Sequence, residues 1–369
     1  MNRTRERGVI GAVLLAACIA SMARGVADAA MLTILLDQYD LNGDGKGDVV
    51  AYDATTVRIQ LMNGATVAAT GYVGASGNVL VGVADFDGDG KDDLVFEGPT
   101  AYRIDLMDGL ARVGRGYVGR GGTSFVAAHD VDGDGLADLV LDGDGVQRID
   151  RMDGTTRLDS VFVPDPGNEY PVAAVADFDL DGHAELVGSG VSSGLVRIRS
   201  VLDACVVCEG FLANGGGAYQ VVAAGDADGD AKADLFLEGP TATRIERMDG
   251  FVSIGRGYVP NGGGAYPLTA VGDFNGDAKV DMASDGASAT RLVLMSGTTP
   301  FATGYVPNAG GDFRLRSLGD LDGDARVDLV SAGQVATPGT GPTLRVDLLD
   351  GTQVVGRGYT PLNGFEIFP

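Results

Sequence analysis

Residues 85–94, DFDGDGKDDL, decide the fold of this chain because the same acidic loop recurs along it. The stretch places five carboxylates within nine residues, and like charges at that density repel one another unless a cation holds them. Successive copies are spaced by 45, 45, 47, 49, 47 and 47 residues. The seven loops begin at Asp40, Asp85, Asp130, Asp177, Asp226, Asp273 and Asp320. A fixed period in this range is typical of a solenoid, a propeller or an array.

Two other segments repeat in step with the acidic loop. The first has the form RIxLMxG, and its arginines are Arg58, Arg103, Arg148, Arg197, Arg244, Arg291 and Arg345. The second closes each copy with a Gly-aromatic or related segment, whose aromatic residues are Tyr72, Tyr117, Phe162, Phe211, Tyr258, Tyr305 and Tyr359. Each copy therefore reads as apolar run, acidic loop, apolar run, RIxLM, Asx-Gly turn and a last strand. That order predicts four short strands joined by tight turns, and no helical periodicity appears.

Seven copies of four strands predict an all-β fold, a seven-bladed β-propeller with four-stranded antiparallel blades of about 45–49 residues. A linear solenoid would use shorter coils and terminal caps, and the sequence shows neither. We expect the propeller to occupy residues 30–369, with residues 33–39 as the first strand of blade one. The tail NGFEIFP is expected to add some pairing to blade one, although no clear exchange of strands between the termini is visible in the sequence.

The acidic loop carries oxygen donors at alternate positions. Positions 1 and 5 are aspartate in every copy, position 3 is aspartate or asparagine, and position 9 is aspartate except for Glu185. These four positions hold 26 of the 51 acidic residues. An all-oxygen set without histidine or cysteine ligands suits a hard cation and not zinc or copper.

Position 7 is mostly lysine or arginine, whose side chains have no lone pair for a metal, so it is expected to contribute its main-chain carbonyl. Oxygens at positions 1, 3, 5, 7 and 9 plus water give the six or seven ligands that calcium prefers, and magnesium would need tighter octahedral geometry. Asp-Gly-rich loops are also common as plain turns. We predict up to seven Ca²⁺ ions as cofactors.

The predicted metal ligands, five per loop, are Asp40, Asn42, Asp44, Lys46, Asp48, Asp85, Asp87, Asp89, Lys91, Asp93, Asp130, Asp132, Asp134, Leu136, Asp138, Asp177, Asp179, Asp181, His183, Glu185, Asp226, Asp228, Asp230, Lys232, Asp234, Asp273, Asn275, Asp277, Lys279, Asp281, Asp320, Asp322, Asp324, Arg326 and Asp328.

The copies are not equivalent. Position 6 is glycine in copies one to four and alanine at Ala231, Ala278 and Ala325, and a left-handed backbone there would cost alanine on the order of 1 kcal/mol. The fourth copy has Leu180 in place of the glycine at position 4. We expect copies one to three to bind calcium best and copy four to be the least certain. The related stretch at 142–145, DGDG, lacks the outer carboxylates and is interpreted as a plain turn.

The N-terminus predicts export. Three arginines precede an apolar stretch at 9–22, and a small-x-small site at 27–29 follows, so residues 1–29 are interpreted as a signal peptide. Fourteen apolar residues are too few to span a bilayer comfortably. Leu15 to Cys18 also resembles a lipobox, so lipidation of Cys18 remains the alternative; either way the protein would be secreted, periplasmic or on the outer surface. Cys205 and Cys208 are interpreted as incidental thiols or a strained local bridge, because a straight strand holds such residues too far apart.

The composition limits the classes of partner that the protein can bind. The chain has 369 residues, 45% of them apolar, no tryptophan and a net charge of −24, which excludes nucleic acid and an anionic membrane surface as main partners. Neither a GxSxG motif nor a phosphate loop is present, and the two histidines lie inside or beside acidic loops. We therefore expect a monomeric binding protein and no enzyme, with no catalytic and no other cofactor-binding residues.

The DxDGDGxxDL loop before a strand, in seven copies with a Gly-aromatic strand between them, resembles the FG-GAP/VCBS repeats. These repeats form the seven-bladed propellers of integrin α subunits and of many exported bacterial proteins, and the RIxLMxG segment looks like the bacterial version. The resemblance covers about residues 33–360. It implies calcium between the first two strands of a blade and a role in adhesion or ligand recognition, with an extracellular protein or a glycan as partner. The alternative is a carbohydrate-active propeller, either a lectin or a polysaccharide lyase.

Two further repeated features are expected to be architectural. The seven arginines of RIxLM recur too regularly for a single active site, so we expect them to form ion pairs between blades. The Gly-rich loops that enter blades four to seven carry Tyr170, Tyr219, Tyr266 and Phe313, for which packing is the first interpretation. The alternative is that these entering loops frame a binding surface on the face opposite the calcium loops.

Overall fold

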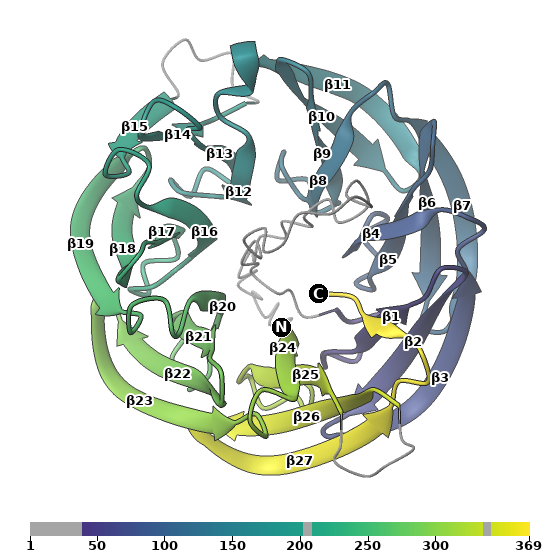
Figure 1. Cartoon of the computed structure of the whole chain (residues 1–369). Coiled ribbons are helices and arrows are strands. Elements are labelled where there is room, and N and C mark those ends of the chain that lie inside the picture. Colours follow the sequence, from purple (N-terminus) through teal and green to yellow (C-terminus); the bar gives the residue numbers. More distant parts are fainter. Residues whose placement is uncertain (1–38, 202–208, 335–340) are drawn as a thin grey trace, which may run out of the picture.

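The computed structural model describes residues 39–201, 209–334 and 341–369. Seven four-stranded antiparallel sheets stand around a ring, as the repeat predicts (Figure 1). The signal peptide, Cys18, Cys205, Cys208 and nearly all of the proposed first strand lie outside the described residues, so those predictions are untested. No helix in the described part of the chain is long and apolar enough to cross a membrane.

Each blade runs from the innermost to the outermost strand in chain order, except that blade one begins with the last strand of the protein. Blade one consists of β28 (Glu366–Ile367), β1 (Val49–Tyr52), β2 (Thr56–Asn63) and β3 (Thr66–Gly74). Blade two consists of β4 (Val79–Ala84), β5 (Asp93–Glu97), β6 (Ala101–Asp108) and β7 (Ala111–Gly119). Blade three consists of β8 (Ser124–His129), β9 (Asp138–Gly143), β10 (Val146–Asp153) and β11 (Thr156–Pro164).

Blade four follows the short 3-10 helix η1 (Pro166–Asn168) and consists of β12 (Val172–Ala176), β13 (Glu185–Ser189), β14 (Leu195–Arg199) and β15 (Glu209–Ala213). Blade five consists of β16 (Gln220–Gly225), β17 (Asp234–Glu238), β18 (Ala242–Asp249) and β19 (Val252–Pro260). Blade six consists of β20 (Leu268–Gly272), β21 (Asp281–Asp285), β22 (Ala289–Ser296) and β23 (Thr299–Pro307). Blade seven consists of β24 (Phe313–Gly319), β25 (Asp328–Gly333), β26 (Thr343–Asp350) and β27 (Gln353–Pro361).

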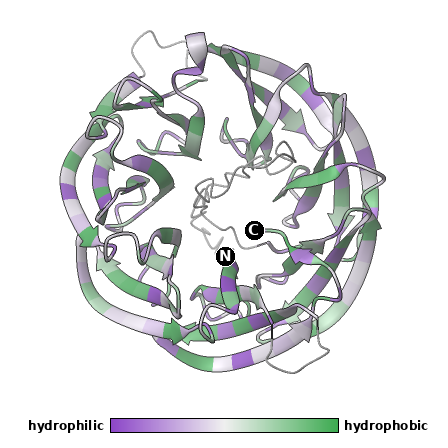
Figure 2. Cartoon of the chain, in the orientation of Figure 1, coloured by the Kyte–Doolittle hydropathy of each residue, from purple (hydrophilic) through white to green (hydrophobic). Residues whose placement is uncertain are grey.

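The core lies between neighbouring blades. The second strand of a blade, such as β5 with its apolar run Leu94 to Phe96, is buried on both faces because a blade packs against each side of it. The outermost strands alternate between exposed and partly buried residues, which Figure 2 shows as alternating bands of hydropathy. The strand pattern of the repeat therefore gives both the sheets and the surfaces that join them.

The C-terminal tail closes the ring. Ile367 pairs with Ala51 and Glu366 with Tyr52, so β28 is the innermost strand at that end of blade one. Near the other end of the chain, Tyr39 pairs with Asp48. The innermost strand position of blade one is therefore occupied by residues from both ends of the chain. The expected pairing of the tail with blade one is confirmed. The tail pairs with part of β1, where residues 33–39 were expected to form the first strand.

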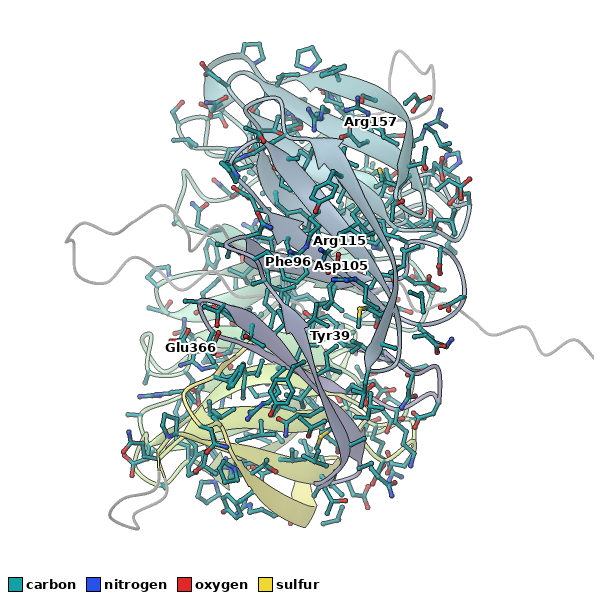
Figure 3. The ribbon with its side chains drawn as sticks, turned by 90° about the vertical axis from the view of Figure 1, so that its right-hand side faces the viewer. Tyr39, Phe96, Asp105, Arg115, Arg157 and Glu366 are labelled. Carbon is teal, nitrogen blue, oxygen red and sulfur yellow. The ribbon has the colours of Figure 1, made fainter. Side chains whose placement is uncertain are left out.

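The arginines of RIxLM join blades, but the prediction of ion pairs between blades is wrong for most of them. Arg103 is 1% exposed and donates hydrogen bonds to the carbonyls of Ala75 and Gly74 in the segment that leaves blade one, at 2.8 and 3.0 Å. Its charged partner, Asp105 at 3.4 Å, lies on the same strand, beside Arg115 (Figure 3). A carbonyl at the end of the preceding blade is always present, whatever side chains that blade carries, and this explains why the arginine can repeat.

The same pattern holds around the ring. Main-chain carbonyls at the end of the preceding blade's outermost strand, or of the residue just after it, accept hydrogen bonds from six of the seven arginines, namely Arg58, Arg103, Arg148, Arg244, Arg291 and Arg345. Among the described residues, Arg197 differs because its partner from the preceding blade is the carboxylate of Asp165, at 3.5 Å.

The aromatic residues of the entering loops have a packing role. Each ring of Tyr170, Tyr219, Tyr266 and Phe313 lies 5.9 to 6.1 Å from the last aromatic residue of its own blade. The guanidinium of the blade's own arginine lies 4.6 to 5.1 Å from the same four rings. The buried charge is thus covered by a π face.

Candidate metal centres

The seven acidic loops connect the first and second strands of the seven blades. In loops two to seven, position 1 follows the innermost strand and position 9 is the first residue of the second strand, as Asp93 is in β5; in loop one, Asp48 directly precedes β1 and pairs with Tyr39. Because every blade is built alike, all seven loops lie on one face of the ring. The stretch at 142–145 is the end of β9 and the tight turn into β10, which confirms that it is a plain turn outside this set.

The carboxylate at position 1 organises the loop. In the second loop, Oδ1 of Asp85 accepts the N–H of Gly88 at 2.7 Å and Oδ2 accepts the N–H of Gly90 at 2.8 Å. The corresponding pair of hydrogen bonds, to the N–H groups of positions 4 and 6, occurs in every loop. Position 5 accepts the N–H of position 7 throughout, for example Asp89 from Lys91 at 2.9 Å. The loop is therefore wound around its own carboxylates.

The carboxylate at position 9 is the buried one. Asp93 is 0% exposed; its Oδ1 accepts the N–H of Met107 at 2.7 Å and its Oδ2 accepts the N–H of Phe86 at 3.0 Å. The first bond ties position 9 to the end of the third strand, and the second ties it to position 2 of its own loop. Burial raises the pKa of the position 9 carboxyl to about 7 in Asp48, Asp93, Asp138, Asp234, Asp281 and Asp328. The backbone hydrogen bonds oppose the effect, and the neighbouring aspartates add to it.

Five of the loops bring three carboxylates together. One oxygen from each of three residues lies within 4.8 Å of the others in the groups Asp85, Asp87 and Asp93; Asp130, Asp132 and Asp138; Asp177, Asp179 and Glu185; Asp226, Asp228 and Asp230; and Asp320, Asp322 and Asp328. Loops one and six carry Asn42 and Asn275 at position 3, so their third donor would be an amide oxygen. Positions 1, 3 and 9 thus meet as the sequence predicts in four loops.

The fourth loop offers a direct test of whether a cation fits. Glu185 is 0% exposed, and burial raises the pKa of its carboxyl to about 8. Its Oε2 accepts the N–H of Phe178 at 2.9 Å, but its buried Oε1 has no hydrogen-bond partner. A buried carboxylate oxygen without a donor is expensive, and a hard cation held by Asp177 and Asp179 would satisfy it. The donor set therefore fits calcium at the loop that we had ranked last; the ranking of affinities stays a prediction.

Basic side chains at position 7 reach the turn of their own blade, and two of them also pair with the position 5 carboxylate of their loop, Lys91 with Asp89 at 3.1 Å and Arg326 with Asp324 at 3.0 Å. Nζ of Lys46 donates to Oδ1 of Asn63 at 2.7 Å, and Nζ of Lys91 lies 2.9 Å from Oδ1 of Asp108. Lys232 pairs in the same way with Asp249. Each partner is the Asx residue of the turn in the same blade, so position 7 is free to vary among residues that reach it.

The loop backbone is left-handed at two positions, and the sequence predicted only one. At position 6, φ is +69° for Ala231, +63° for Ala278 and +68° for Ala325, which confirms the expected strain. Position 4 is also left-handed, with φ of +64° at Leu180. The signal was present in the sequence, because position 4 is glycine in the other six copies.

The loops are bonded to one another around the ring. The N–H of Asp92, at position 8 of loop two, donates to the carbonyl of Asp40 in loop one at 2.9 Å. Bonds of 2.6 to 3.0 Å from position 8 join all neighbouring loops, and between loops three and four the acceptor is the carbonyl of Val131 at position 2. The side chain of Asp92, which was not predicted to contribute, also joins the two loops, because its Oδ2 accepts the N–H of Asp40 at 2.7 Å. A second series of bonds joins the turn glycine of a blade to position 2 of the preceding loop, as from Gly109 to Leu41 at 2.8 Å. Each site is therefore braced by the next blade.

A comparison with known protein families agrees with this arrangement. A family model described as FG-GAP-like repeat matches residues 40–96, which span the first two acidic loops. No curated protein matches the chain. Similar solved structures include Hsv2 of Kluyveromyces lactis, with 13% identity over 73% of each chain and a TM-score of 0.43. Another is the dihydro-heme d1 dehydrogenase NirN in complex with DHE, with 10% identity, 98% of this chain and 81% of that chain covered, and a TM-score of 0.47.

Likeness at that level of identity and TM-score carries no argument about what the chain does. The match to the repeat family is more informative, because the acidic loop that it covers recurs at a nearly constant spacing in all seven blades. With seven such loops on seven four-stranded blades, this chain belongs to the FG-GAP repeat β-propellers.

Proposed function

We propose that the protein is an exported calcium-binding propeller that serves as an adhesion or ligand-recognition module and not as an enzyme. The observation that carries the calcium part is the buried position 9 carboxylate, grouped with the aspartates of its loop and, at Glu185, left with an oxygen that no donor satisfies. Bound calcium would supply the positive charge that these oxygens lack. The chain's own residues hold the cluster in place through the N–H groups of the loop and of the neighbouring turn.

In this proposal calcium is part of the scaffold. For a dissociation constant of about 0.1 mM and about 1 mM calcium outside the cell, each site would add about 1.4 kcal/mol to the free energy of unfolding. Occupation of all seven would approach 10 kcal/mol, which is comparable with the whole stability of an ordinary domain. The loop-to-loop hydrogen bonds would transmit that stabilisation from blade to blade.

Recognition is assigned to the face opposite the metal centres, where the Gly-rich loops enter the blades. The aromatic rings of these loops are engaged with arginines and with the outer strands, so the loop backbones and their polar side chains would present the binding surface. The partner would be an extracellular protein or a glycan. Export through the N-terminal segment, with or without lipidation of Cys18, a monomeric state and calcium as the resident ion belong to the same proposal.

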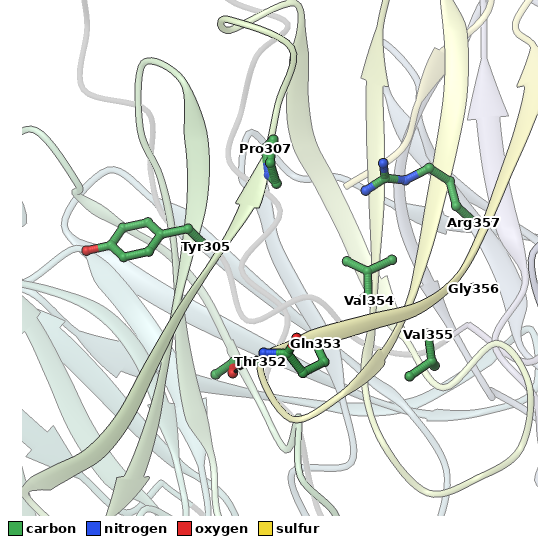
Figure 4. A pocket seen from close by; sticks show the side chains of 8 residues that line it. All are labelled: Tyr305, Pro307, Thr352, Gln353, Val354, Val355, Gly356 and Arg357. Atoms are coloured by element: carbon green, nitrogen blue, oxygen red, sulfur yellow. Dashed lines mark hydrogen bonds between the residues drawn. The ribbon is translucent and has the colours of Figure 1, made fainter.

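A lectin is the second candidate, and exposed aromatic residues on the outermost strands favour it. Tyr72, Tyr117 and Tyr305 are 61%, 63% and 55% exposed, and tyrosine rings can stack on sugars. Tyr305 and Pro307 of β23 line a shallow cleft of about 550 Å³ together with Thr352 and residues 353–357 of β27 (Figure 4). A polysaccharide lyase would need a catalytic base outside the repeat, and no observation favours one.

The first experiment is to count calcium bound to the purified mature protein and to follow thermal unfolding with calcium and with EGTA. Five to seven ions and a large loss of melting temperature in EGTA are expected. Little bound metal and an unchanged melt would mean that the loops are only turns. A glycan array and a screen of extracellular proteins, both with calcium present, then separate the lectin from the protein-binding module.

A further inference from the structure

Two blades carry an arginine where their counterparts carry leucine, three residues after the arginine of RIxLM. Blades one, two, six and seven have Leu61, Leu106, Leu294 and Leu348 at this position. Blades three and five have Arg151 and Arg247. The third strand passes beside the acidic loop of its own blade, so this position brings a fixed positive charge to two of the metal centres.

Both guanidinium groups contact the carboxylate at position 3 of the loop. An Nη atom of Arg151 lies 3.4 Å from Oδ2 of Asp132, and Nε of Arg247 donates to Oδ2 of Asp228. The two aspartate side chains are only 14% and 12% exposed, so water screens these pairs incompletely. Position 3 is one of the predicted calcium ligands, which means that an internal cation competes for it.

The two arginines differ in whether a second carboxylate shares their charge. Arg151 lies opposite Asp159 on β11 and also forms a bidentate ion pair with it. Arg247 lies opposite Gly255 on β19, a residue without a side-chain charge. Asp159 therefore shares the charge of Arg151, whereas the charge of Arg247 is directed at Asp228.

The carboxylates of loop five are grouped differently from those of the other loops. In loops two, three, four and seven, the group within 4.8 Å joins positions 1, 3 and 9. In loop five, it joins positions 1, 3 and 5, that is Asp226, Asp228 and Asp230. The altered grouping occurs in the blade whose arginine has no competing partner on the facing strand.

We propose that Arg247, and to a smaller extent Arg151, act as internal cations that lower the calcium affinity of loops five and three. The inference rests on the proposed calcium binding. A single positive charge about 5 Å from a divalent ion weakens binding on the order of tenfold even at the dielectric constant of water. In the absence of calcium, the same guanidinium neutralises part of the cluster and keeps the loop folded. Loops three and five thus bind calcium more weakly than they would with leucine at this position of the third strand.

The test is a calcium titration that resolves single loops. Methyl-labelled alanine in the full mature chain gives the Ala231 methyl as a reporter for loop five and the Ala325 methyl as a reporter for loop seven. The variant Arg247→Leu installs the residue that four other blades carry. Arg314→Leu is the matched control, because it removes the same charge at the start of β24, on the opposite face, where Arg314 faces Asp285 at 3.5 Å.

We expect Arg247→Leu to move the Ala231 midpoint to calcium concentrations lower by about tenfold and to leave the Ala325 midpoint within about twofold. Arg314→Leu should move neither. Arg247→Gln, which keeps a long polar side chain without the charge, serves if the leucine variant does not fold and should act in the same direction. The reverse exchange, Leu106→Arg, should weaken loop two, as followed by the amide of Gly90.

The outcomes separate the two proposals. If the wild-type protein binds no calcium, the proposed function fails. If the wild type binds calcium but neither Arg247→Leu nor Arg247→Gln changes the Ala231 midpoint, calcium binding stands and the role of Arg247 is overturned. A shift that Arg314→Leu reproduces would also overturn it, since net charge alone would then be responsible.

Discussion

The main-chain N–H of Gly47 donates a hydrogen bond of 2.6 Å to the carbonyl of Asp320, and this bond joins the first acidic loop to the last. A bond from position 8 joins every other pair of neighbouring loops as well, with Val131 at position 2 as the acceptor between loops three and four. The ring is therefore closed twice, by the loops on one face and by the pairing of β28 with β1 at the inner edge of blade one. We call these contacts between the two ends of the chain the seam, and we expect the stability of the whole propeller to depend on the residues that form it.

Phe368 is the residue that fastens the tail. Its ring is 5% exposed and lies 6.1 Å from the rings of both Tyr39 and Tyr52. Phe368→Ala should lower the free energy of unfolding by about 3 kcal/mol, through lost burial and the cavity left behind. Urea unfolding measures this loss. Phe365→Ala, which removes a half-buried ring 4.8 Å from the guanidinium of Arg58, is the control with the smaller expected effect, and equal losses in both variants would contradict the role of Phe368.

Replacing the three alanines at position 6 with glycine should stabilise the protein. Ala231, Ala278 and Ala325 have φ between +63° and +69°, where a β-carbon is strained. Each Ala→Gly substitution should raise the free energy of unfolding by about 0.5–1 kcal/mol. Thermal melts in calcium measure the gain. The reverse change, Gly90→Ala, tests strain alone, because a β-carbon there would meet nothing within 4 Å; it should destabilise by a similar amount.

The metal-free protein should become less stable as the pH rises. Burial raises the pKa of Asp93 and its counterparts to about 7, whereas an aspartate in the unfolded chain titrates near 4. Between those values, the native state holds protons that the unfolded state has released, so the free energy of unfolding contributed by these groups falls from about pH 4 to about pH 7. Melting temperatures in EGTA across this range check the sign. A melting temperature that climbs steadily with pH would contradict it.

Calcium should reverse that dependence. The ion requires the charged carboxylates, so protons compete with it and its affinity should fall as the pH is lowered below about 7. Titrations at pH 8 and pH 6 in buffers of different ionisation enthalpy would count the protons that are released on binding. A pH-independent affinity would mean that the position 9 carboxylates do not bind the ion.

Arg103 should be hard to replace. It is 1% exposed, its guanidinium lies 3.7 Å from the ring of Phe96, and it donates to two carbonyls of the preceding blade. Arg103→Lys keeps the charge but loses the planar fork, and should cost about 1–3 kcal/mol. Arg103→Met leaves the two carbonyls without a donor and should cost more. Chemical unfolding ranks the variants, and a lysine variant as stable as the wild type would show that charge alone matters.

The repeat made the blades and the loops predictable. Seven aspartates at nearly equal spacing, each before an apolar run, determine which residues meet at positions 1, 3 and 9, because a loop of nine residues between paired strands has little freedom. The left-handed turn at position 6 could be inferred in the same way from glycine and alanine. Leu180 shows the limit of that reasoning, since the equally left-handed position 4 was not recognised from six glycines and one leucine.

Contacts between blades could not be read from a single repeat. Arg103 finds its acceptors in the main chain of another blade, and a main-chain carbonyl leaves no signature in the sequence. The pairing of Arg247 with Asp228 depends on how the third strand passes the loop, which periodicity does not specify. The seam depends on a two-residue strand, Glu366–Ile367, too short to show an alternating pattern.

The seam also determines from which point of the propeller a flanking segment would extend. The hydroxyl of Tyr39 donates to the carbonyl of Pro369 at 2.6 Å, so both ends of the described chain meet on one strand at the inner edge of blade one. Anything joined before Tyr39 or after Pro369 would leave the ring from this single point. A tether there would hold the disc near its axis and not by its rim. The whole circumference, with its outermost strands, would then stay accessible from every side.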